Sequence, residues 1–306
     1  MQTTAFDPGF TQRYGAPLRR MINKDGSFNV HRRGTTWKDA HLYLYLIAMP
    51  WWRFLILISV AYIVVNLIFA SAYYGLGPGE LRGPALPTAA GRFANAFFFS
   101  AQTLTTVGYG TLAPTGIAAN GLAAFEALVG LMAFALGTGL LVGRVSRPSA
   151  RIGFSERMLM APYGNGSSLQ FRVVNKRPNT LLELRASLLL MTVEDSGEGA
   201  VRRYHILGLE RENVSFLPLT WTIVHPIDRQ SPLWGKTAAN LEELQAEVLV
   251  LVQAYDDTFS QIVHARNSYR YDEIVWGARF TPAFHVASGG DLVLEVEQVG
   301  TFAPTA

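Results

Sequence analysis

The chain has 306 residues, of which 49% are hydrophobic and 16% are charged, and its formal net charge is +3. The absence of cysteine excludes disulfides, thiolate metal sites and a thiol nucleophile. The six histidines show no paired ligand spacing, and the sequence contains neither a phosphate-binding loop nor a nucleophile elbow, so an enzyme is not expected. The excess positive charge lies beside long apolar runs, which favours membrane lipid over nucleic acid as its partner.

The first 35 residues form an N-terminal segment rich in Lys and Arg, which is unlike a signal peptide and is expected to stay in the cytoplasm. Residues 36–46 mix apolar and polar side chains at helical spacing, and Pro50 is placed to open a following helix. We expect an amphipathic helix in the inner membrane interface, with a soluble helix packed on the following domain as the alternative.

Two apolar runs then predict two membrane spans. Residues 54–74 carry no charge over 21 residues, which as a helix covers about 31 Å, roughly the thickness of a bilayer core. Residues 117–143 contain a single ionisable residue, Glu126. Basic residues are sparse between the runs, whereas Arg144, Arg147 and Arg151 follow the second, so both termini are expected inside the cell.

Between the spans, residues 75–87 are rich in Gly and Pro and predict an irregular loop, while residues 93–105 are apolar and helix-like. The string 105–110 follows, reading Thr-Thr-Val-Gly-Tyr-Gly. In a soluble protein such a string indicates a strand entering a glycine turn. The flanking spans instead favour a short pore helix and a loop held at membrane depth.

A potassium filter replaces the water around the ion with rings of backbone carbonyls from four copies of one loop. The carbonyls of Thr106, Val107, Gly108 and Tyr109, with the Thr106 hydroxyl, are predicted to bind K⁺. Tyr109 is also expected to brace the loop against its pore helix. Gly108 and Gly110 can adopt the left-handed angles that such a row of carbonyls requires. The filter residues are therefore predicted to be Thr106, Val107, Gly108, Tyr109 and Gly110.

Beyond residue 151 the pattern changes to short runs rich in β-branched and aliphatic residues, separated by turn clusters. We expect strands over residues 169–174, 188–193, 214–224, 247–254 and 292–299, forming one β-sandwich with its own core. The predicted domains are the N-terminal segment 1–35, a slide helix and transmembrane pore domain over 36–148, and a cytoplasmic β-sandwich over 149–306.

Several strings, in this order along the chain, resemble the prokaryotic inward-rectifier potassium channels (KirBac type): residues 96–100, 144–148, 221–228 followed by 231–233, and 265–269 with 272–277. The resemblance covers nearly the whole chain. It implies a homotetramer in the bacterial inner membrane, each subunit having a slide helix, an outer helix, a pore helix with filter, an inner helix and a cytoplasmic immunoglobulin-like sandwich. It implies passive K⁺ conduction gated at the inner helices by the cytoplasmic domain and anionic lipid, with no cofactor besides K⁺ in the filter.

The resemblance also assigns residues along the ion path. Phe134 matches the cavity position, and because an apolar ring cannot hold a multivalent cation, only weak block by polyamine or Mg²⁺ is expected. Glu198 and Asp257 match acidic positions of the cytoplasmic vestibule. The alternative is that both are acidic residues in turns that only contact solvent.

Filter support is expected from Thr105, Gln102 and Glu126. Glu126 should lie behind the pore helix and not on the pore axis, where four copies would place carboxylates close together. Gln102 stands where the family more often has an acid, and no basic residue follows the filter, so an ion-pair brace is expected to be absent.

On the inner helix, Gly130 and Gly139 match hinge positions, but close helix packing is the favoured interpretation for any single glycine. The residues Leu140, Leu141 and Val142 are predicted to form an apolar gate.

Arg144 and Arg147, with Arg53 as a partner, match contacts to anionic lipid, either phosphoinositide-type or bacterial, although ordinary positive-inside charges are the alternative. The sign of lipid control is left open. Two rival functions also remain: a membrane-anchored β-sandwich sensor without conduction, which leaves the filter string unexplained, and a two-span channel gated by a small ligand or Ca²⁺.

Overall fold

The computed structural model describes residues 9–10, 20–31, 33–34, 42–146, 151–195 and 200–305. Two compact units divide the chain: residues 33–147 form one, here called the membrane unit, and residues 148–306 with residues 1–32 form the other, here called the β unit. Three expectations lie outside the described residues, namely the first part of the slide helix, Arg147 and Glu198.

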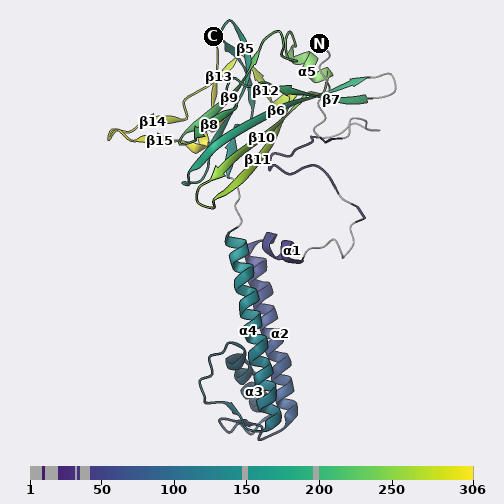
Figure 1. The fold of residues 1–306 in the computed structure, drawn as a ribbon, viewed down its shortest axis with the longest axis vertical. Helices are drawn as coiled ribbons and strands as arrows, with labels where there is room; N and C mark the ends of the chain where they lie inside the picture. Colours follow the sequence, from purple (N-terminus) through teal and green to yellow (C-terminus); the bar gives the residue numbers. More distant parts are fainter. Residues whose placement is uncertain are drawn as a thin grey trace. The chain divides into compact units, whose positions relative to one another are not determined.

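Four helices build the membrane unit: α1 (Leu42–Ala48), α2 (Trp51–Leu76), α3 (Ala89–Leu104) and α4 (Ile117–Val145). Helices α2 and α4 run side by side, with α3 against them near one end and α1 beside the other end (Figure 1). Both α2 and α4 are long and apolar enough to cross a membrane. The two predicted spans are therefore present as helices that extend the predicted runs by a few residues.

The short helix before residues 105–110, here called the filter string, begins at residue 89, which is earlier than the apolar pattern predicts. The side chain of Thr88 accepts a hydrogen bond from the backbone N–H of Gly91 at 3.1 Å, so it caps one of the free N–H groups of the first turn of α3. Strand β1 (Leu81–Arg82) pairs with β2 (Ala113–Pro114), which ties the loop before α3 to the segment that follows the filter string.

Two five-stranded sheets build the β unit. The first has the strand order β11-β10-β6-β7 with β8 paired to β6, and the second has the order β12-β4-β5-β3 with β9 paired to β5. All of these pairs are antiparallel except β12 with β4. The strands are β3 (Ile152–Phe154), β4 (Met158–Tyr163), β5 (Gly166–Asn175), β6 (Leu181–Asp195), β7 (Ala200–Leu207), β8 (Asn213–Phe216), β9 (Thr220–Ile227), β10 (Glu247–Asp256), β11 (Gln261–Arg270) and β12 (Ile274–Trp276).

Alternate residues of both sheets point into one hydrophobic core. Phe171 on β5, Leu190 on β6 and Val252 on β10 are among its members, and each is at most 2% exposed. One core filled from two sheets is the arrangement of a β-sandwich.

Shorter elements complete the β unit, and two of the strands expected from the sequence differ from those found. The run 214–224 is interrupted between β8 and β9, where Pro218 has no N–H to donate to a sheet. The run 292–299 is a strand only over its first three residues, because residues 296–300 form a 3₁₀ helix. The shorter elements are β13 (Ala278–Phe280), β14 (Phe284–Val286), β15 (Leu292–Leu294), β16 (Phe302–Pro304), α5 (Ala238–Glu243), η2 (Tyr271–Glu273) and η3 (Val296–Gly300).

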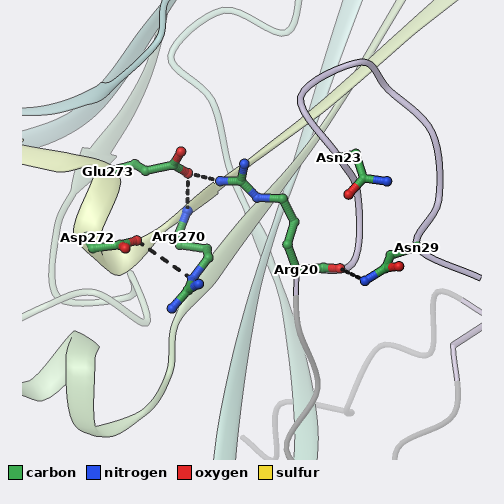
Figure 2. A pocket seen from close by; sticks show the side chains of 6 residues that line it. All are labelled: Arg20, Asn23, Asn29, Arg270, Asp272 and Glu273. Carbon is green, nitrogen blue, oxygen red and sulfur yellow. Dashed lines mark hydrogen bonds and ion pairs between the residues drawn. The ribbon is translucent and has the colours of Figure 1, made fainter.

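The N-terminal residues 20–30 pack on the β unit. The backbone N–H of Met21 donates to both carboxylate oxygens of the buried Glu247, at 3.0 and 3.1 Å. Arg20 and Lys24 form ion pairs with Glu273, and Figure 2 shows Arg20 reaching that carboxylate beside Arg270. This segment is thus tied to the β unit by hydrogen bonds and charge.

Candidate functional site

The filter string leaves the C-terminal end of α3 and is held there by main-chain hydrogen bonds. The carbonyl of Gln102 accepts from the N–H groups of Val107, at 2.9 Å, and Gly108, at 3.3 Å, and the carbonyl of Thr103 accepts from Thr106 at 3.0 Å. The last carbonyls of a helix have no partner within the helix. Here they anchor the start of the loop, as expected for a filter that follows a pore helix.

Within the loop, every second residue has a left-handed backbone, with φ of +60° at Thr106, +55° at Gly108 and +81° at Gly110. Val107 and Tyr109, which lie between them, do not have positive φ. Alternation of positive and negative φ can turn successive peptide groups the same way, so that the N–H groups face one side and the carbonyls the other. Such a row of carbonyls can bind a dehydrated cation when several loops face one axis. A β-branched residue is rarely left-handed, so Thr106 marks the loop as specialised.

The side chains of the loop have few partners within one chain. Val107 is 51% exposed and Tyr109 is 75% exposed. The expected packing of Tyr109 on its own pore helix is therefore not found within one chain.

Behind α3, Glu126 is fully buried, as its predicted position requires. It contacts the hydroxyl of Tyr73, on α2, at 2.7 Å and the hydroxyl of Ser100, on α3. Ser100 also lies 3.0 Å from the side-chain oxygen of Asn66. Sequence reasoning missed Asn66, Tyr73 and Ser100; the only signal was that polar side chains interrupt apolar runs.

Gly130 lies where α4 crosses the end of α3. A Cβ at this position would be 2.1 Å from the carbonyl oxygen of Leu104, so only glycine allows the two backbones to approach this closely. At Gly139 nothing lies within 4 Å of such a Cβ. The geometry assigns Gly130 to close packing, while bending at Gly139 stays a prediction.

At the other end of α4, the guanidinium of Arg144 is already occupied. It donates to the carbonyls of Leu46 and Met49, at the end of α1, the latter at 2.7 Å. It also lies 4.6 Å from the ring centroid of Trp51 and 4.4 Å from that of Phe54. Arg144 thus joins the ends of three helices.

Arg53 differs from Arg144 in its surroundings. It is exposed in the first turn of α2, with its guanidinium 5.0 Å from the ring centroid of Trp52. Its charged group therefore remains accessible to a ligand.

The predicted cavity, gate and vestibule positions that the structure describes are exposed or partly exposed in the single chain. Phe134, Leu141 and Val142 are 75%, 40% and 58% exposed along α4, and Leu140 is intermediate. Asp257 is exposed in the turn between β10 and β11, where its N–H lies 3.4 Å from the carbonyl of Thr180.

His225 and Asp228, which lie close together in the sequence, have structural roles. His225 is buried, with Nδ1 2.6 Å from the carbonyl of Gly208 and Nε2 2.8 Å from the hydroxyl of Ser231, and burial lowers its pKa. Asp228 accepts from the N–H groups of Gln230 and Ser231 in the adjacent turn. Among the described residues, no group of three or more His, Asp or Glu side chains could hold a metal ion.

A surface hollow of about 470 Å³ lies beside the N-terminal segment. The charged side chains that line it are paired with one another. Figure 2 shows Arg20, Arg270, Asp272 and Glu273 contacting one another there. The hollow therefore offers no unpaired charge to a ligand.

Two apolar helices enclose a short helix, the loop after that helix alternates in backbone handedness, and a β-sandwich follows. This arrangement defines the subunit of a two-span ion channel. The family described as "Ion channel" matches residues 61–147, and the family described as "Inward rectifier potassium channel C-terminal domain" matches residues 152–304. The chain belongs to the inward rectifier potassium channel family.

Sequence identity to individual relatives supports this assignment. The chain is 40% identical to the inward rectifier potassium channel Kirbac3.1 of Paramagnetospirillum magnetotacticum, over 90% of this chain and 93% of that protein. It is 28% identical to the human G protein-activated inward rectifier potassium channel 3, over 94% of this chain and 79% of the relative. A likeness to the sporulation control protein Spo0M of Bacillus subtilis covers 42% of this chain and 50% of that chain at 10% identity, and its TM-score of 0.25 is too low to carry an argument.

Proposed function

We propose that four copies of this chain surround one axis and conduct K⁺ passively through a filter built from residues 106–110. The observation that carries the proposal is the backbone of this loop, left-handed at Thr106, Gly108 and Gly110. A single loop supplies one side of an ion site, and four copies would supply the full rings of carbonyls that replace the hydration shell.

Exposure within one chain supports the tetramer. Only 11% of the most apolar stretch of α4 is buried, and Val107 and Tyr109 lie open to other copies. We place the channel in a bacterial inner membrane with both termini in the cytoplasm, since Arg144 and Arg151 follow the second span.

The pore would continue along α4. Phe134 lines the cavity in this arrangement, and its apolar ring gives only weak block by polyamine or Mg²⁺. The gate would be the apolar ring made by Leu140, Leu141 and Val142, which closes by dewetting. Glu198 and Asp257 would attract cations to a cytoplasmic vestibule through their charge.

We assign the contact with an anionic lipid headgroup, phosphoinositide-type or bacterial, first to Arg53 and Arg147. Arg53 is exposed at the start of α2, where a cation gains about 1 kcal/mol near anionic lipid. Arg144 contributes less directly, because its guanidinium is committed to Leu46 and Met49.

The test is tracer rubidium uptake into liposomes that carry the purified protein. Barium-sensitive uptake is expected with potassium inside and is expected to disappear with sodium inside. Gly108→Ala should abolish the uptake, because alanine is strained at a φ of +55°. Gly164→Ala is the matched control, since Gly164 has a φ of +53° in a β unit turn with nothing near its Cβ position.

Two results would contradict the proposal. Equal uptake with sodium inside would reject a potassium-selective filter. An intact tetramer that stays silent with and without anionic lipid would favour the membrane-anchored β-sandwich without conduction.

A further inference from the structure

Four buried polar side chains meet behind α3, inside the apolar part of the membrane unit. They come from three helices: Asn66 and Tyr73 from α2, Ser100 from α3 and Glu126 from α4. Each is at most 1% exposed within a single chain. Nothing outside the chain can therefore touch these side chains, and they must satisfy one another.

Three contacts link the four side chains in a row. Asn66 Oδ1 lies 3.0 Å from Ser100 Oγ, Ser100 Oγ contacts Glu126 Oε1, and Tyr73 Oη lies 2.7 Å from Glu126 Oε2. The orientation of the Asn66 amide is set by its own helix, because Asn66 Nδ2 donates to the carbonyl of Tyr62 at 2.8 Å. The Asn66 oxygen, which can only accept, must then face Ser100.

Each of these three contacts needs one hydrogen atom between its two oxygens, but the hydroxyl groups of Tyr73 and Ser100 supply only two. Tyr73 supplies the hydrogen toward Glu126 Oε2. Ser100 has one hydrogen for two acceptors, Asn66 Oδ1 and Glu126 Oε1. With a carboxylate at Glu126, one fully buried acceptor would face another without a hydrogen between them, which is costly.

We propose that Glu126 is a neutral carboxylic acid in the folded channel. Its proton on Oε1 is donated to Ser100 Oγ, Ser100 donates to Asn66 Oδ1, and Tyr73 donates to Glu126 Oε2. Every polar atom of the row is then satisfied. Among the described residues no cation is paired with Glu126, and an unpaired charge at membrane depth is expensive.

The row of four side chains positions the filter loop through its contact with α3. Ser100 lies two residues before Gln102, whose carbonyl holds the N–H groups of Val107 and Gly108. The acid fixes Ser100 between α2 and α4 and thereby fixes the end of α3 on which the filter stands. Glu126 is a positioning residue in this scheme, which rests on the proposed conduction through the filter.

The first test is infrared difference spectroscopy of the full-length protein in liposomes, wild type minus Glu126→Gln. A carbonyl band of a protonated carboxylic acid is expected at neutral pH, shifting in D₂O and persisting at mildly alkaline pH. Exposed Asp and Glu side chains are ionised there and cancel in the difference. No such band would overturn the proposal. This measurement requires no conduction, so it separates failure of this inference from failure of the channel proposal.

The second test is barium-sensitive rubidium uptake by two variants. Glu126→Gln should keep the uptake and its loss in sodium, since its amide can donate to Ser100 and accept from Tyr73. Glu126→Met, similar in size but unable to hydrogen-bond, should lose uptake or selectivity. Loss of assembly or selectivity in Glu126→Gln would show that the charge is needed and would overturn the neutral acid. Full activity of Glu126→Met would overturn the positioning role.

Discussion

The β unit and the membrane unit differ in how much of their apolar surface they bury by themselves. In the β unit, two sheets enclose a continuous core with residues such as Phe171 and Leu190 almost fully buried. In the membrane unit, Phe134 is 75% exposed, and the buried cluster found among the described residues lies around α3. The β unit therefore buries enough apolar surface to hold its own fold. The membrane helices bury little beyond the contacts around α3, so we expect lipid or further copies of the chain to cover the rest of their apolar surface.

The largest effect is expected from Gly130→Ala, at a position where two helices of the membrane unit pack closely. The added Cβ would lie 2.1 Å from the carbonyl oxygen of Leu104, so α3 or α4 must move and displace the start of the filter loop. We expect loss of barium-sensitive rubidium uptake. Gly121→Ala is the control on the same helix, since nothing lies within 4 Å of its Cβ position. Normal uptake by Gly130→Ala would refute the close-packing interpretation.

Phe171→Ala tests the other side of the comparison, the self-sufficient core of the β unit. Phe171 is 0% exposed, and removal of a buried aromatic ring costs about 3–5 kcal/mol of unfolding free energy. Chemical denaturation followed by tryptophan fluorescence measures the change. Phe216→Ala, at a position 67% exposed, should change stability by less than about 0.5 kcal/mol. Equal effects of the two variants would mean that the sandwich core contributes little.

Within the membrane unit, two variants separate the hydrogen-bonded Arg144 from the exposed Arg53: Arg144→Gln and Arg53→Gln. Arg53→Gln should reduce the response of rubidium uptake to anionic lipid by about fivefold, the equivalent of 1 kcal/mol. Arg144→Gln should change uptake in neutral lipid as well, because it removes two hydrogen bonds that join α4 to the end of α1. If Arg144→Gln altered only the lipid response, its assignment as a structural link would be wrong.

The smallest expected effect is a pH dependence of the β unit through His225. Burial lowers the pKa of this imidazole from its ordinary value of 6.5, so the unfolded chain takes up the proton first as pH falls. The stabilisation is therefore complete above pH 6.5 and is lost as pH falls below it. Thermal unfolding across this range should show a flatter profile for His225→Gln, and no flattening for the exposed His264→Gln. An unchanged profile in His225→Gln would place the pH dependence elsewhere.

Features set by local pattern could be predicted from the sequence. The charge-free run at 54–74 and the run at 117–143 predicted α2 and α4, because a bilayer demands one length and one polarity. The glycines of the filter string predicted left-handed backbone at Gly108 and Gly110, because only residues without a Cβ adopt it freely. The β-rich pattern predicted the sandwich but missed the break at Pro218 and the 3₁₀ helix after β15.

Contacts between residues far apart in the chain were decided by the tertiary structure alone. Sequence reasoning placed Arg144 among lipid contacts, yet its guanidinium is held by carbonyls about a hundred positions earlier. It left Gly130 between two interpretations that the carbonyl of Leu104 separates. It could not find Ser100 as the partner of Glu126. Periodicity and propensity report how a residue relates to its neighbours in sequence, whereas hydrogen-bond partners and close approaches depend on which helices the fold brings together.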